Sequence, residues 1–146
     1  MMPTSKAKRF TVCTICIVVV LVLGMTALDK LWHFSLFSAK LKMSPWKVLA
    51  LHHSFFAWAV PITELTVSLL LLGKRTGRWG FAGAVVLFTV FSGYMLWIWI
   101  KNIKVACGCN EFIERMTVLQ HVRFNLALLM FSLLGFLLTK RNSSKI

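Results

Sequence analysis

Two cysteines separated by a single glycine are the residues whose spacing best suits redox chemistry. Cys107 and Cys109 flank Gly108. In an extended chain, Cα atoms two residues apart lie about 7 Å from each other, at the limit for a disulfide, so the chain must bend at the glycine. A disulfide closed in this way is strained and easily exchanged. The spacing favours a catalytic or relay pair, and a structural clip or a soft-metal site remain as alternatives.

A second cysteine pair, Cys13 and Cys16, has the spacing of a thioredoxin motif. It lies inside an apolar stretch, without the charged or helix N-terminal setting that activates a thiol. We therefore expect these two cysteines to be buried and unreactive.

Glu64 is an acid inside an otherwise apolar stretch that is long enough to cross a membrane. An ionisable group at such a depth costs several kcal/mol unless it is neutral or paired, and it is a candidate functional residue by default. Pro61, three residues earlier, frees a backbone carbonyl for other partners. We predict that Glu64 is mostly neutral, with either a functional role or a hydrogen bond to a neighbouring helix.

His121 and Asn125 are four residues apart and would share one face of a helix. They could orient a substrate or hold the cysteine loop, or make ordinary hydrogen bonds between helices. Together with Cys107 and Cys109, His121 would suit Zn²⁺ or Cu(I). No second Cys or His pair lies close in the sequence, so we predict no metal centre.

The composition indicates where these residues must lie. Hydrophobic residues make up 58% of the 146 residues and charged residues 14%, whereas soluble domains are about 25% charged. A water-soluble enzyme is therefore nearly excluded. The net charge of +13 comes from 17 Lys and Arg against 4 Asp and Glu. These basic residues cluster at the ends of apolar blocks, where they set topology and meet anionic lipid, so we predict no nucleic-acid partner.

Four apolar blocks are long enough to cross the bilayer: 10–28, 48–73, 79–100 and 116–139. Backbone polar groups cannot stay unpaired in lipid, so each block must be a helix. The sequence predicts an all-α integral membrane four-helix bundle that forms a single domain over 1–146. Residues 30–47 interleave apolar and basic side chains and are expected to lie along the outer membrane surface.

The distribution of Lys and Arg predicts that both termini are cytoplasmic. Nine basic residues fall on the side of the termini and eight on the other side, and the nine sit tightly against the helix ends. The nine are Lys6, Lys8, Arg9, Lys74, Arg75, Arg78, Lys140, Arg141 and Lys145. This orientation places Cys107 and Cys109 outside the cytoplasm, where disulfides persist.

In the order of these features, the chain resembles the MauE family of methylamine-utilisation proteins, in the DoxX-like membrane protein superfamily. The resemblance is carried by Gly24 to Lys30 with Phe34 and Phe37, Pro61 to Leu65 with Leu69 to Gly73, Cys107 to Cys109, and Gln120 to Asn125. It implies a multi-pass protein of the inner (plasma) membrane. Such a protein is needed for disulfide formation or for maturation of an exported enzyme, and it acts with a thioredoxin-like extracytoplasmic partner.

The resemblance and the cysteine spacing together favour a membrane thiol–disulfide relay. Cys107 and Cys109 would be the redox pair, Glu64 and His121 supporting residues, and a quinone the direct electron acceptor. Two alternatives remain: a non-enzymatic assembly or export factor in which the cysteines form a clip, and a small protein that handles metal or solute, with Glu64 lining a path.

Overall fold

The computed structural model of the chain describes residues 5–101 and 118–143, and every regular element in these two ranges is an α-helix. The helices are α1 (Ser5–Trp32), α2 (Phe34–Lys42), α3 (Lys47–Leu51), α4 (His53–Leu72), α5 (Gly77–Ile100) and α7 (Val118–Ser143). Four of them are long and apolar enough to span a membrane, over Lys6–Trp32, His53–Leu72, Gly77–Ile100 and Leu119–Thr139. The predicted all-α membrane bundle is confirmed.

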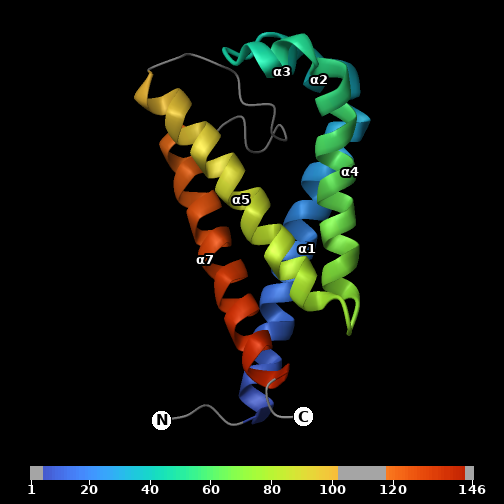
Figure 1. Cartoon of the computed structure of the whole chain (residues 1–146), viewed down its shortest axis with the longest axis vertical. Helices are drawn as coiled ribbons and strands as arrows, with labels where there is room; N and C mark the ends of the chain where they lie inside the picture. Colours follow the sequence, from blue (N-terminus) through green and yellow to red (C-terminus); the bar gives the residue numbers. More distant parts are fainter. Residues whose placement is uncertain (1–4, 102–117, 144–146) are drawn as a thin grey trace.

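The four long helices run alternately up and down the bundle (Figure 1). The start of α1, the turn at residues 73–76 and the end of α7 lie together at one end, called here the termini end. The opposite end carries α2 and α3 with the start of α4, and it is called here the α2–α3 end. Four crossings place both ends of the described chain on one side. The cytoplasmic position of that side stays a prediction.

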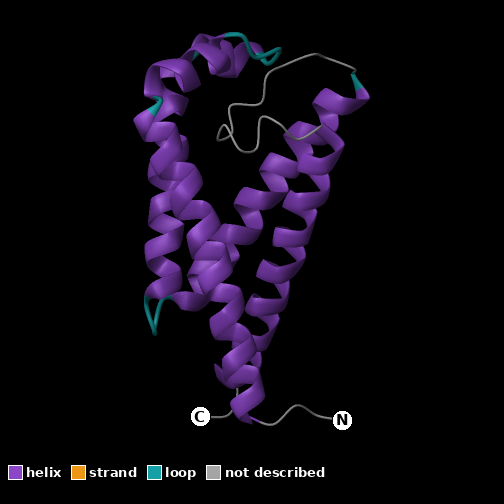
Figure 2. Cartoon of the chain, turned by 180° about the vertical axis from the view of Figure 1, so that it is seen from behind, coloured by secondary structure: helices purple, strands orange, loops and turns teal. Residues whose placement is uncertain are grey.

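Two pairs of helices make up the bundle: α1 packs on α4, and α5 packs on α7. The pairs meet near the termini end and diverge toward the α2–α3 end (Figure 2). They approach each other closely at Gly80 of α5. A Cβ atom added there would lie 2.6 Å from the backbone nitrogen of Leu71 and 2.9 Å from the carbonyl carbon of Leu70. Only a residue without a side chain lets the two backbones come this close.

An apolar core joins all four long helices, and the outward faces are apolar as well. The core residues are Ile15, Val19, Leu23, Val67, Leu71, Phe81, Ala84, Phe88 and Leu128. Large apolar side chains that point outward include Phe10, Leu21, Met25, Phe55, Leu69, Val86, Val90, Met130 and Phe131. A water-soluble bundle would put polar residues on those faces. Here the outer surface suits lipid.

The segment expected along the membrane surface, residues 30–47, contains α2. Its side chains contact α5, which belongs to the other helix pair. The Ser44 and Tyr94 hydroxyls are hydrogen-bonded at 2.9 Å. The Trp46 ring packs edge-on against Tyr94 and Trp97, with centroid separations of 5.3 and 5.6 Å. These contacts join the α2–α3 connection to α5.

Two of the differences from the predicted helix boundaries bear on the site. The first helix was expected to end at residue 28, before two charged residues, but α1 continues to Trp32. It can do so because both charges find partners: Lys30 pairs with Glu64 at 2.7 Å, and Asp29 lies 3.3 Å from His33 one turn later. The second expected span is broken at His52, so that α3 and α4 are separate helices.

Candidate functional site

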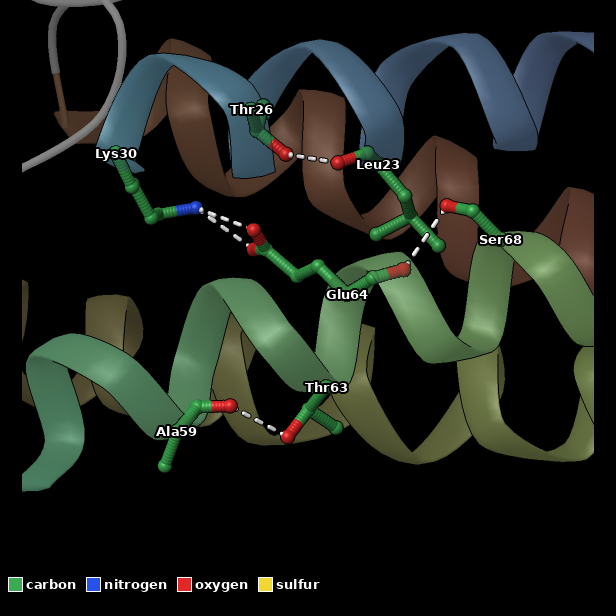
Figure 3. A network of polar contacts seen from close by, with 7 residues as sticks. All are labelled: Leu23, Thr26, Lys30, Ala59, Thr63, Glu64 and Ser68. Atoms are coloured by element: carbon green, nitrogen blue, oxygen red, sulfur yellow. Dashed lines mark hydrogen bonds and ion pairs between the residues drawn. The ribbon is translucent and has the colours of Figure 1, made fainter. Parts of the chain in front are cut away.

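A buried ion pair joins α1 to α4 in the interior of the bundle. The Lys30 ammonium donates hydrogen bonds to both carboxylate oxygens of Glu64, at 2.7 and 2.9 Å (Figure 3). The side chains are 7% and 1% exposed. From the sequence alone, Lys30 is expected in a surface segment and Glu64 in a membrane span.

The direction of the two helices explains why these side chains meet. A helical side chain leans toward the N-terminus of its own helix. Lys30 lies near the C-terminal end of α1, so it leans inward from the α2–α3 end. Glu64 lies eleven residues after the first residue of α4, about 16 Å along the helix. Because α4 is antiparallel to α1, Glu64 leans back toward Lys30.

Aromatic rings from two further helices lie beside the ammonium. The Lys30 Nζ atom is 5.9 Å from the ring centroid of Phe37 in α2 and 5.7 Å from that of Phe91 in α5. Both distances are within the range of cation–π attraction. One cationic group is therefore contacted by side chains from three other helices.

The local structure of α4 holds the Glu64 side chain in place. Pro61 is buried inside the helix one turn earlier, where it removes one backbone hydrogen bond. On the next turn, the Ser68 hydroxyl donates to the Glu64 backbone carbonyl at 2.9 Å. The carboxyl group itself is the buried partner of Lys30. The prediction of a neutral Glu64 is therefore corrected, because the cation that offsets its charge lies in the part of α1 that the sequence had assigned to a loop.

This arrangement is costly to build, which makes it a candidate for function. Each buried ion loses several kcal/mol of hydration, and the attraction between the two ions repays this only when the geometry is good. Ionisable residues within a membrane span are rare and commonly mark substrate, proton or ion sites. Chemically, the pair offers a proton donor and a proton acceptor beside two aromatic rings, in a setting that excludes water.

His121 is also buried, but it lies on the other helix pair. It is 3% exposed, and its Nε2 atom has no hydrogen-bond partner among the described residues. Gly135 of α7 lies against Phe81 of α5. The two helices are antiparallel. Counting fourteen residues from this contact toward the α2–α3 end leads to His121 on α7 and to Met95 on α5, so these two residues lie at the same level. His121 therefore faces the interface between α5 and α7.

Two buried hydroxyl groups lie on the same two helices as His121 and Met95. Ser92 of α5 and Ser132 of α7 are 8% and 0% exposed, and neither hydroxyl has a partner among the described residues. Neither serine stands out in the sequence, because serine is common in membrane helices.

The structure describes two of the four cysteines. Cys13 and Cys16 are free thiols on α1, and the Cys16 thiol donates to the Leu71 carbonyl at 3.3 Å. Cys13 is exposed on the outer surface rather than buried, so the expectation of burial is wrong for this residue. Cys107 and Cys109 lie outside the described residues. Within residues 5–101 and 118–143, no group of three or more His, Cys, Asp and Glu side chains could hold a metal ion.

Comparison with known proteins decides the family. The family model described as Methylamine utilisation protein MauE matches residues 8–138. The chain belongs to the MauE family. No curated protein and no solved structure matches it. The match runs from α1 into α7, so it covers nearly all of the four membrane spans, and it confirms the resemblance drawn from the sequence.

The structure adds a relation that the sequence alone did not reveal. Lys30 and Phe37 carried the MauE resemblance in the first part of the chain, and Glu64 carried it in the second. In the folded protein the Lys30 ammonium contacts both of the others. A lysine at the end of one apolar block and a glutamate inside the next were the available signal. Their opposite charges could have suggested the pairing.

Proposed function

We propose that this MauE-family membrane protein takes part in thiol–disulfide exchange, with Cys107 and Cys109 as its redox pair. Family membership is the observation that carries the proposal, because a C-x-C pair stands where the family resemblance places its cysteine motif. In the sequence this pair lies between the end of α5 and the start of α7. Both of these helix ends are at the α2–α3 end of the bundle (Figure 1).

Charge supports an orientation in which that end faces away from the cytoplasm. The sequence has nine basic residues on the side of the termini and eight on the other. Lys30 belongs to the eight, but its charge is buried against Glu64, which leaves seven that can act as surface charges. The positive-inside rule then favours cytoplasmic termini more strongly than the raw count does. The inner (plasma) membrane is the location that the MauE resemblance implies, and this orientation is compatible with it.

The proposed exchange uses a thioredoxin-like protein on the outer side. A thiolate of the partner attacks the Cys107–Cys109 disulfide, one cysteine leaves as a thiolate, and a mixed disulfide forms. The second thiolate of the partner then attacks the mixed disulfide. The partner leaves oxidised, and Cys107 and Cys109 become a dithiol that an electron acceptor must reoxidise. The oxidised partner would introduce disulfides into exported proteins, which is the maturation role that the family resemblance implies.

Serine variants test this function in cells. Replacing either Cys107 or Cys109 by Ser should abolish maturation of the exported target, because one sulfur cannot form the internal disulfide. One of the two variants should also accumulate a mixed disulfide with a thioredoxin-like protein, visible as a band on a non-reducing gel that disappears on reduction.

The matched control is the variant in which Cys13 and Cys16 are both replaced by Ala, and it should retain activity. Full activity of a variant that carries both Cys107→Ser and Cys109→Ser would contradict the redox function and favour a non-enzymatic assembly factor.

A further inference from the structure

The Lys30 ammonium has one hydrogen-bond donor that Glu64 does not use. A lysine ammonium carries three N–H donors, and the two carboxylate oxygens of Glu64 take two of them. The third must point away from the carboxylate. Among residues 5–101 and 118–143, the rings of Phe37 and Phe91, contributed by α2 and α5, also lie at the ammonium. In this part of the chain the site therefore combines a donor that Glu64 does not use with two flat apolar surfaces.

Such a set of groups matches a particular ligand chemistry. The free N–H suits a carbonyl oxygen, and a charged donor makes this a strong hydrogen bond. The phenyl rings suit a flat conjugated ring, which stacks on aromatic side chains. The Lys30 and Glu64 side chains are 7% and 1% exposed, and the outer surface of the bundle is apolar. A ligand that reaches this site must therefore be soluble in the bilayer.

We propose that Lys30, Glu64, Phe37 and Phe91 form a binding site for the headgroup of a membrane-soluble quinone, which reoxidises Cys107 and Cys109. Lys30 binds one quinone carbonyl oxygen, Glu64 fixes the ammonium, and the two rings flank the headgroup. This inference rests on the proposed function, because the redox pair supplies the electrons.

The reaction balances in atoms and electrons. The two thiols lose two electrons and two protons as the S–S bond forms, and the quinone gains two electrons and two protons as its two carbonyl oxygens become hydroxyl groups. Lys30 transfers one proton to the oxygen that it binds. A proton released by the thiols reaches the amine and restores the ammonium.

Binding of a short-chain ubiquinone to the purified full-length protein in lipid nanodiscs tests the site. Wild-type protein should bind this probe saturably, followed by quenching of tryptophan fluorescence. Lys30→Met should weaken binding about tenfold or more, since it removes a charged hydrogen bond. Phe91→Leu should weaken it about threefold, because an apolar side chain remains but the ring is lost. Lys42→Met, which removes an exposed charge of α2, should leave binding unchanged.

Phe91→Leu keeps the ion pair, so it decides the matter if Lys30→Met fails to fold. The proposal is overturned if wild-type protein shows no saturable binding, or if folded Lys30→Met or Phe91→Leu protein binds as tightly as wild type.

Binding to the protein with both Cys107→Ser and Cys109→Ser separates this proposal from the redox function. The quinone site predicts wild-type affinity for this variant, and lost binding would contradict it. If the serine variants are inactive in cells but wild-type protein binds no quinone, the redox function stands and this site is wrong.

Discussion

Lys30 and Glu64 depend on each other for their position inside the bundle. Each side chain alone would be an isolated charge in a region without water, whereas together they form two hydrogen bonds of 2.7 and 2.9 Å. Lys30 would otherwise extend its long side chain outward to the interface, as lysines near the ends of membrane helices do. The carboxylate of Glu64 is what holds it inward.

Replacing one member of the Lys30–Glu64 pair should lower the free energy of unfolding more, per substitution, than replacing both members together. Glu64→Gln and Lys30→Met each leave one buried group without its counterion, and we expect each to lower the free energy of unfolding by about 3–5 kcal/mol. The variant with both changes should lose clearly less than the sum of the two. Unfolding by sodium dodecyl sulfate in mixed micelles measures all three, with Lys42→Met as the control. Additive losses would show that the two charges do not stabilise each other.

At the scale of elements, Gly80 fixes how closely α5 approaches α4. The backbone atoms of Leu70 and Leu71 occupy the space that a side chain would need. Gly93, on the same helix, has no atom within 4 Å of its added Cβ. Gly80 and Gly93 therefore offer a matched comparison, within one helix, between a close backbone contact and open space.

Gly80→Ala should force α4 and α5 apart and lower the free energy of unfolding by about 1–3 kcal/mol. Gly93→Ala should be neutral or slightly stabilising, because Ala favours the helix by up to about 1 kcal/mol over Gly. The same unfolding measurement compares the two variants. Equal effects would mean that the α4–α5 approach is looser than the backbone distances indicate.

For the whole molecule, the fold class could be predicted from sequence and the site only in part. Long apolar blocks must be helices in lipid, and this requirement fixed the number of long helices. The pairing of Lys30 with Glu64 joins residues 34 apart in sequence, and helical periodicity does not tell which faces of two helices meet. The end of α1 was placed too early for the same reason. Two adjacent charged residues, such as Asp29 and Lys30, normally end a membrane span unless another helix supplies a partner for the charge.

The central claim is that Cys107 and Cys109 cycle between dithiol and disulfide on the outer side of the membrane. The most direct measurement is labelling of intact cells with a membrane-impermeant thiol reagent, in protein that carries Cys13→Ala and Cys16→Ala. Both remaining cysteines should react fully after brief reduction with dithiothreitol and become protected again once the reductant is removed. Cysteines that never react, or that react equally before reduction, after it and after its removal, would contradict the claim.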